Sequence, residues 1–381
     1  MSSESQNVVV IGSGIAGLRA ATALADIGLQ VTLVERAKRL GGHAAEWACM
    51  ATDACAKCSA CLVQDQMGKA LRHPRIRVIL GAEVRSCAGA IGDYRLSLVP
   101  ASSENGQRLT WPELLLSGPQ EVMGSAVVMA TGFDAYNAAA SPMLGYGQLE
   151  GVLTTRDLDE VLREDDLSRF LPEERGPQKL AFIQCVGSRD RQSGHQVCSQ
   201  FCCRTTIRLA RRLRHLRPNL DITVFYIDLQ VMSKEFVTFY DQARGEDIHF
   251  LQGVPAEIIP GEERKLRVFS VPSGSGQAVP FEFDRIVLAI GLSPTMSHPA
   301  LAEVLGVKLN PFGYFPANGS NPVGTNGCSG VFFVGGCAGP TDIQGSCKQA
   351  LAVAAQIARA VRTTDSRSEP TVVAAGAATS N

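Results

Sequence analysis

Four cysteines with the spacing of a metal site stand within a short stretch of the sequence, at Cys185, Cys198, Cys202 and Cys203. Thiolates are the ligands of iron–sulfur clusters and of many zinc sites. The adjacent Cys202 and Cys203 are awkward partners for a disulfide, and small core cysteines seldom crowd in this way. The spacing therefore predicts an iron–sulfur cluster, with zinc or structural thiols as the alternatives.

Two local patterns position these thiols. The apolar run KLAFIQ (179–184) predicts a buried strand that leads into Cys185. The run TTIRLARRLRHL (205–216) has a helical pattern, so the other three cysteines fall where this helix begins. A helix N-terminus favours negative charge, because free backbone N–H groups point outward there. The thiolates of a cluster suit this position.

A second motif opens the chain. An apolar strand (7–11) runs into Gly12-x-Gly14-x-x-Gly17, followed by a helical pattern, a second strand and Glu35. In such a motif the glycines permit the tight turn, the approach of a pyrophosphate and close helix–strand packing. The acidic residue accepts hydrogen bonds from a ribose. The combination predicts dinucleotide binding and an α/β fold.

Further motifs favour FAD over NAD. Gly41-Gly42 follows the acidic residue, and Ala130-Thr131-Gly132 follows a later strand. This layout resembles the thioredoxin-reductase-like flavoproteins of the pyridine-nucleotide-disulfide oxidoreductase family. The resemblance implies two dinucleotide-binding domains, the second inserted in the first. Near the end, Gly335-Gly336 is followed by Cys337 where that family has Asp, and a helix with its N-terminus facing the flavin should start near residue 343.

The FAD contacts expected from these motifs are Gly12, Ser13, Gly14, Ile15, Ala16, Gly17, Glu35, Arg36, Gly41, Gly42, His43, Val84, Ala130, Thr131, Gly132, Gly335, Gly336, Asp342, Ile343 and Ser346. A solvent-exposed loop position is the alternative for His43, and a solvated helix position is the alternative for Lys348 as a flavin contact. Cys337 and Cys347 are expected near the flavin.

The inserted domain should carry a second glycine triplet after 179–184, and the cysteines stand there instead. We therefore expect NAD(P)H binding to be lost. The expected domains are 1–133 with 291–362 for FAD, 134–290 for the insertion, and a disordered tail at 363–381. No residue set resembles a substrate nucleophile with its base, so no catalytic residue is predicted.

The cysteine spacing, FIQ before it, and the phrases HPRIRVILGAEV (73–84) and FYDQARGEDIHFLQG (239–253) resemble the A-type subunit of heterodisulfide reductase. The resemblance implies a [4Fe–4S] cluster on Cys185, Cys198, Cys202 and Cys203 beside the FAD. The methanogen subunit is longer than this chain. In its compact length this chain resembles the A-type subunit of sulfur oxidisers. This implies an electron-transfer role in cytoplasmic sulfur oxidation, with B- and C-type subunits, a lipoate-binding protein and a homodimer as partners.

Cys49, Cys55, Cys58 and Cys61 form a second group with a ferredoxin-like Cys-x2-Cys-x2-Cys core. A second cluster, a site that a partner docks on or completes, and plain thiols or a disulfide are the open alternatives. Arg189, Arg204 and Arg208 are candidates for offsetting cluster charge, or else decorate the helix surface. Arg211, Arg212 and Arg214 are expected on a solvated face or a partner contact.

Composition narrows the class of protein. The 381 residues carry a net charge of −1 and twelve cysteines. No basic stripe indicates nucleic acid binding, no apolar run reaches the ~20 residues that span a membrane, and no signal-peptide layout is present. We expect a cytoplasmic oxidoreductase. A stand-alone NAD(P)H-dependent disulfide reductase and a scaffold with a vestigial flavin site are the rival hypotheses.

Overall fold

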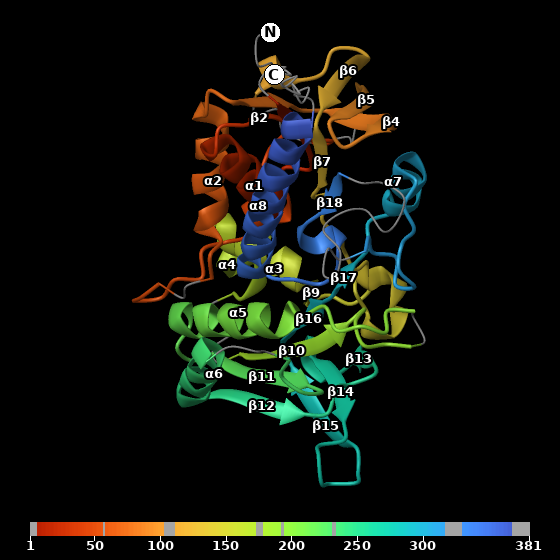
Figure 1. The fold of residues 1–381 in the computed structure, drawn as a ribbon. Helices are drawn as coiled ribbons and strands as arrows, with labels where there is room; N and C mark the ends of the chain where they lie inside the picture. The colour runs from red at the N-terminus through yellow and green to blue at the C-terminus, as the bar shows by residue number, and fades with distance from the viewer. Residues whose placement is uncertain are drawn as a thin grey trace, which may run out of the picture.

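A computed structural model describes residues 6–55, 58–102, 111–172, 178–191, 194–230, 234–316 and 330–367. Two parallel five-stranded sheets form the cores of two domains, one above the other in Figure 1. The first domain contains the N-terminal third and the C-terminal helix. The second is built from the middle of the chain.

The first sheet has the order β18-β7-β1-β2-β3, with every neighbouring pair parallel. Its strands are β1 (Asn7–Ile11), β2 (Gln30–Val34), β3 (Ile76–Ile79), β7 (Ala126–Met129) and β18 (Val331–Phe333). Val8, Val9 and Val10 are fully buried, as expected of a central parallel strand covered on both faces.

Helices cover one face of this sheet. In Figure 1, α1 (Ile15–Asp26) and α8 (Ile343–Arg367) run side by side, with α2 (Cys61–Arg72) beside α1. On the other face, Val9 and Val127 pack with Leu96 from an antiparallel sheet and with Leu305 from α7 (His298–Leu305). The strands of this small sheet are β4 (Ala82–Ala90), β5 (Asp93–Pro100) and β6 (Gln120–Gly124).

The second sheet has the order β12-β11-β10-β16-β9 and is also parallel. Its strands are β9 (Val152–Thr154), β10 (Lys179–Val186), β11 (Asp221–Tyr226), β12 (Ile248–Gln252) and β16 (Arg285–Ile290). Its helices are α3 (Thr155–Arg163), α4 (Leu167–Phe170), α5 (Cys202–Leu216) and α6 (Lys234–Gly245). Phe182 packs toward Leu209 of α5, and Ile183 toward the antiparallel strands β13 (Ile258–Pro260), β14 (Leu266–Ser270) and β15 (Val279–Phe283).

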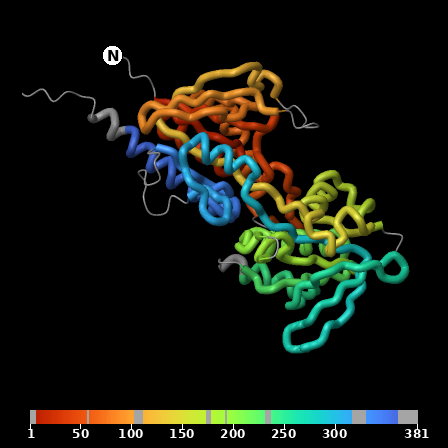
Figure 2. Tube along the Cα trace, turned by 90° about the vertical axis from the view of Figure 1, so that its right-hand side faces the viewer, coloured from red at the N-terminus to blue at the C-terminus, as the bar shows by residue number. Residues whose placement is uncertain are grey.

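The chain crosses between the domains twice, and Figure 2 shows the two bodies from the side. The crossing segments pair as the antiparallel strands β8 (Asp134–Ala135) and β17 (Leu292–Ser293). The predicted boundaries after residues 133 and 290 lie beside these strands and stay a prediction. Short 3-10 helices complete the described chain: η1 (His43–Glu46), η2 (Pro112–Leu114), η3 (Ala138–Ala140), η4 (Pro142–Leu144), η6 (Glu262–Arg264) and η7 (Gly335–Cys337).

The predicted tail begins too early. Helix α8 continues to Arg367, so residues 363–367 are helical rather than part of a tail. Val361 is the last residue of this helix in the core of the first domain, and the helix continues beyond it by six residues. Residues 368–381 lie outside the described part of the chain.

Candidate functional site

A cavity of about 620 Å³ lies at the carboxyl ends of the strands of the first sheet. Its walls come from the turns after β1, β2 and β7, from β4, from α7 and from the first turn of α8. Ligands of parallel α/β sheets bind at this edge, and the volume is within the range of cofactor pockets.

The structure brings most of the predicted FAD contacts together at this cavity. Those that line it are Gly12, Gly14, Ile15, Ala16, Glu35, Arg36, Gly41, Gly42, His43, Val84, Ala130, Thr131, Gly132, Gly336, Asp342, Ile343 and Ser346. Ser13, Gly17 and Gly335 do not line the cavity. Their role as FAD contacts stays a prediction.

The three glycines of the opening motif have different surroundings. Gly12 has φ of +100°, and a Cβ there would lie 2.4 Å from the Ala130 carbonyl oxygen. A Cβ on Gly17 would lie 1.8 Å from the Gly12 oxygen, so this glycine permits close packing of α1 on β1. A Cβ on Gly14 would meet no atom within 4 Å, and Gly14 lines the cavity. The open space at Gly14, next to the N-terminus of α1, fits a pyrophosphate.

Glu35 is held in place by the same turn. One carboxylate oxygen accepts hydrogen bonds from the backbone N–H and the hydroxyl of Ser13, both at 2.7 Å. The other accepts from the backbone N–H of Ala37 at 2.7 Å. A carboxylate has about four acceptor positions, so Glu35 retains capacity for a ribose hydroxyl.

His43 joins the Gly41-Gly42 loop to the turn after β7. Its Nε2 lies 2.8 Å from the carbonyl oxygen of Phe133, and the two rings stack with centroids 4.9 Å apart. Because a carbonyl only accepts, Nε2 carries the proton. Glu46 lies 3.8 Å from Nδ1, and hydrogen bonding to His43 together with the nearby Arg156 and Arg39 lowers the pKa of Glu46 to about 2.

The N-terminus of α8 closes the far wall. One oxygen of Asp342 accepts a hydrogen bond from the backbone N–H of Gly345 at 2.7 Å, which fixes the first turn of the helix. The other accepts from Arg204 of α5 at 2.7 Å. The helix that carries two of the candidate cluster cysteines is thus tied directly to the wall of the cofactor cavity.

The four candidate ligand cysteines come from two segments of the second domain. Cys185 lies near the end of β10 with a left-handed φ of +63°, where the pairing with β16 shifts register between Ile183 and Val186. Left-handed backbone outside glycine is strained and concentrates at functional sites. Gln200 and Arg189 in the same region also have positive φ.

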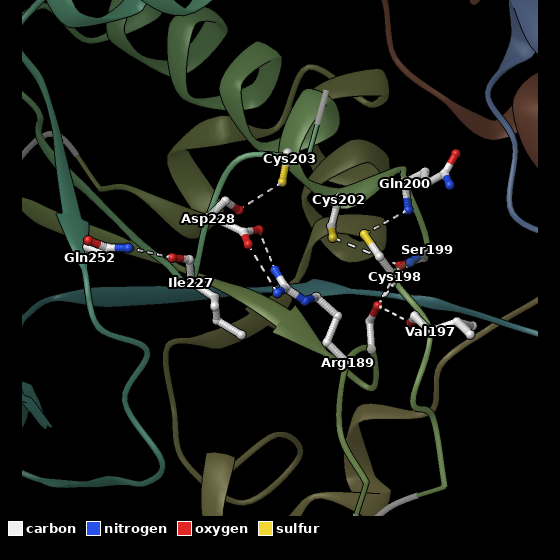
Figure 3. A network of polar contacts seen from close by, with 11 residues as sticks. Arg189, Val197, Cys198, Ser199, Gln200, Cys202, Cys203, Ile227, Asp228 and Gln252 are labelled. Atoms are coloured by element: carbon white, nitrogen blue, oxygen red, sulfur yellow. Dashed lines mark hydrogen bonds and ion pairs between the residues drawn. The ribbon is translucent and has the colours of Figure 1, made fainter. Parts of the chain in front are cut away.

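Figure 3 shows the sulfurs of Cys198, Cys202 and Cys203 turned toward the same space at the start of α5. The backbone N–H of Gln200 donates to Cys198 Sγ at 3.3 Å, and Ser199 Oγ lies 4.0 Å from Cys202 Sγ. Such contacts to sulfur are among the interactions that tune cluster potentials.

The thiols interact with one another. Hydrogen bonds from Cys185 and Cys203 hold the pKa of the buried Cys202 thiol well below its usual value. Hydrogen bonding to Cys202, together with burial, raises the pKa of Cys185 and of Cys203. Within the described residues, no group of three or more His, Cys, Asp or Glu side chains is arranged so that it could hold a metal ion. Thiolates are the usual ligands of iron–sulfur clusters, so the chemistry of the donor set is compatible with one.

The arginines near the cysteines are paired. Arg189 forms a two-pronged ion pair with Asp228, and Arg204 pairs with Asp342. Arg208 is largely buried, and burial lowers its pKa to about 10. Farther along α5, Arg211 pairs with Glu246, and Arg214 with Asp247. Arg212 donates to the carbonyl of Ala51. These three arginines are partly exposed and contact their own chain, and the predicted solvated face or partner contact stays a prediction.

Residues 10–56 match the family described as an NAD(P)-binding Rossmann-like domain. Thioredoxin reductase of Lactococcus lactis has a similar structure, with a TM-score of 0.58 and 18% sequence identity, covering 94% of this chain and all of that one. This confirms the predicted fold class, an α/β protein with two dinucleotide-binding domains of the thioredoxin-reductase type.

Two sequence relatives cover almost the whole chain, and both are A-type subunits of CoB–CoM heterodisulfide reductases. The relative from Methanopyrus kandleri, the second of two such iron–sulfur subunits, is 28% identical over 96% of this chain and 66% of its own length. The relative from Methanosarcina mazei, part of a ferredoxin-linked reductase, is 26% identical over 97% of this chain and 55% of its own. The chain is similar to these A-type subunits over almost all of its length. It spans between about half and two thirds of their length.

The second cysteine group differs from the first in its exposure. Cys49, Cys55 and Cys61 are exposed, and Cys58 is half-buried close to Arg208. Residues 56 and 57, inside the motif, lie outside the described part of the chain. Cys58 packs against the core of the second domain and lines a small cavity with Arg204 and Arg208.

Two of the remaining cysteines do not line the cavity, and their position near the flavin stays a prediction. Cys337 does not reach the cavity: its thiol is fully buried and donates to the carbonyls of Met129 at 3.2 Å and Val334 at 3.1 Å. The 3-10 turn at Gly335–Cys337 directs it into the core. Cys347 packs against α1 and does not line the cavity either. Cys328 lies outside the described residues.

Several cavity residues carry no local sequence signal. Ser297, Ala300, Leu301 and Val304 come from α7 and its approach, and Arg156 comes from α3 of the other domain. Only the packing of α7 against β4 and of the two domains against each other brings them there. No helix in the described ranges is both long and apolar enough to cross a membrane.

Proposed function

We propose that this chain is an FAD- and [4Fe–4S]-containing electron-transfer protein, an oxidoreductase component of a heterodisulfide-reductase-like complex. The observation that carries the proposal is the position of the cysteines. They stand at the carboxyl end of β10 and the start of α5, the place that the glycine turn occupies between β1 and α1 in the first domain. The Arg204–Asp342 ion pair joins this centre to the FAD cavity.

When bound, FAD supplies two-electron chemistry and an iron–sulfur cluster supplies one-electron chemistry. Gly14 and the N-terminus of α1 receive the pyrophosphate, and Glu35 the ribose. His43, Phe133 and the first turn of α8 surround the flavin end. Cys185, Cys198, Cys202 and Cys203 hold the cluster.

The turn after β10 also supports the loss of NAD(P)H binding. A Cβ on Gly187 would lie 2.0 Å from the ring of Tyr136, so this ring packs directly against the turn. Tyr136 is buried and meets His195 edge-on at 5.1 Å. Aromatic side chains fill space beside the position where a dinucleotide-binding turn would expose its backbone.

We place the chain in cytoplasmic sulfur oxidation, with B- and C-type subunits and a lipoate-binding protein as partners and with a homodimer as its core. The resemblance to the compact A-type subunits of sulfur oxidisers supports this setting. The exposed Cys49, Cys55 and Cys61 support a partner-facing surface at the edge of the first domain. Sulfur chemistry is assigned to partner subunits.

An anoxic coulometric titration of the purified protein tests the proposal. Absorbance follows the flavin and electron paramagnetic resonance follows the cluster. We expect uptake of about three electrons per chain, two by the flavin and one by the cluster, and no bleaching of the flavin by NADPH. Rapid bleaching by NADPH in an iron-free protein would instead support a stand-alone disulfide reductase.

A further inference from the structure

Two smaller cavities adjoin the cofactor cavity where the domains meet. One, of about 140 Å³, shares His43, Glu46 and Phe133 with the cofactor cavity. The other, of about 50 Å³, extends toward Cys58. Trp47 lines all three, and Asp159 of α3 lines both smaller ones. Asp159 therefore borders two chambers, and both of them share lining residues with the cofactor cavity.

Asp159 is a buried carboxyl with few contacts that would offset the cost of burying its charge. The residue is 5% exposed. One of its carboxylate oxygens accepts a hydrogen bond from the backbone N–H of Ala48 at 3.2 Å. It takes part in no ion pair within the described residues. Burial raises its pKa to about 7, although the Ala48 hydrogen bond and Arg163 oppose the shift. A buried carboxyl that neither pairs nor packs against the core, and instead borders two cavities, is suited to exchanging a proton.

Other charged groups face the same chambers. On the flavin side these are His43, Glu46, Arg156, Glu160 and Arg163, and on the other side Cys58, Arg204, Arg208 and Asp342. Most are committed to each other: Arg156 pairs with Glu46, Arg163 donates to the Glu46 carbonyl, and Arg204 pairs with Asp342. Glu46 stays ionised at neutral pH, because its pKa is near 2. The pKa of Glu46 is thus lowered and that of Asp159 is raised, although both carboxyls line the same chamber. Such a pair consists of one fixed charge and one group that can carry a proton.

The proposed electron traffic needs a proton carrier. A flavin that accepts two electrons at neutral pH also takes up a proton, and it returns that proton when the electrons leave one at a time through a cluster. The 140 Å³ chamber has room for several water molecules, since each needs roughly 10–15 Å³ of such space.

We propose that Asp159 accepts and donates this proton, exchanging it with the flavin end of the cofactor cavity through water in the 140 Å³ chamber. The proton lost by the Asp159 carboxyl is the one gained at the flavin, and the carboxylate regains a proton from solvent water. The inference rests on the proposed function, because it requires FAD in the large cavity.

Rapid-mixing reduction of the FAD-loaded protein by dithionite, as a function of pH and in heavy water, tests the role of Asp159. For the wild type we expect an inflection near pH 7 and a solvent isotope effect. In D159N the inflection disappears and reduction slows at least about tenfold, while D159E restores part of both. The matched control is E164Q, the same chemical change at the exposed end of α3. An unchanged rate and inflection in D159N would overturn the proposal.

A second readout does not depend on turnover. The infrared difference spectrum between oxidised and reduced wild-type protein should contain the C=O band of a protonated carboxyl that changes with redox state, shifts on 13C-aspartate labelling and is absent in D159N. If D159N fails to fold, the labelled wild type decides, and absence of such a band rejects the relay. A wild type that binds no FAD refutes the proposed function itself, so the two failures are distinguishable.

Discussion

Alanine at two glycines of the opening motif should separate cofactor binding from folding. Gly14 has φ of −64° and ψ of 177°, a conformation open to any residue, and its Cβ would project into free space beside the cavity. G14A should therefore leave the unfolding free energy of the FAD-free protein within about 1 kcal/mol of the wild type.

The same substitution should weaken FAD binding. The added methyl group would stand where the pyrophosphate approaches the N-terminus of α1, and it would disrupt a hydrogen bond to a charged group. Such a bond contributes about 1.5–3 kcal/mol, which corresponds to a loss of affinity of about ten- to 150-fold.

Gly17 should behave in the opposite way. Its Cβ would lie 1.8 Å from the Gly12 oxygen and 3.2 Å from the Ala130 side chain, so α1 would have to move away from β1. G17A should lower the unfolding free energy by about 3 kcal/mol or more. G118A, at an open position outside the cavity, is the matched control.

Urea unfolding of the FAD-free proteins and quenching of flavin fluorescence on binding provide both quantities. The expected result is a crossed pattern in which G14A loses affinity and G17A loses stability. If G14A binds FAD as tightly as the wild type and G118A do, the pyrophosphate does not lie at this turn.

Three further predictions concern the domain interface and the cluster. Because burial raises the pKa of Asp159 from 3.8 to about 7, its contribution to stability is present below about pH 4 and is lost as pH rises to 7, on the order of 4 kcal/mol. D159N should flatten urea midpoints over this window, and a wild-type profile that is already flat would contradict the assignment. A double-mutant cycle of R204M and D342N should give a coupling free energy of about 1 kcal/mol, since both side chains are partly exposed; zero coupling would show that the bridge does not hold the domains. C202S should lose cluster iron and retain FAD, whereas C87S, in the small antiparallel sheet, should keep both. Iron analysis checks this, and equal iron in the two variants would exclude Cys202 as a ligand.

Features that depend on local sequence could be predicted before the structure was known. The strand–glycine–helix unit around Gly12 and Gly14 depends on contacts within a few residues, and so does the placement of Cys202 and Cys203 at a helix N-terminus. For the same reason the position of Glu35 beside the cavity could be predicted from its place directly after β2.

Features that depend on packing between distant segments could not be predicted from the sequence. Cys337 follows a glycine pair that lines the cavity at Gly336, yet the next turn buries its thiol against the Met129 carbonyl. Asp159 occurs in an amphipathic helix with a capping box, and its carboxylate accepts a hydrogen bond from Ala48 of the other domain. A surface pattern in the sequence thus concealed an interdomain residue.

The central claim is that the cysteines at the start of α5 hold an iron–sulfur cluster beside an FAD. The most direct test is the content of iron, acid-labile sulfide and flavin in protein purified without oxygen, with an electron paramagnetic resonance spectrum after reduction. We expect about four irons, about four sulfides and one FAD per chain. About eight irons per chain would indicate a second cluster at Cys49–Cys61. A folded protein that contains flavin and neither iron nor sulfide would contradict the central claim.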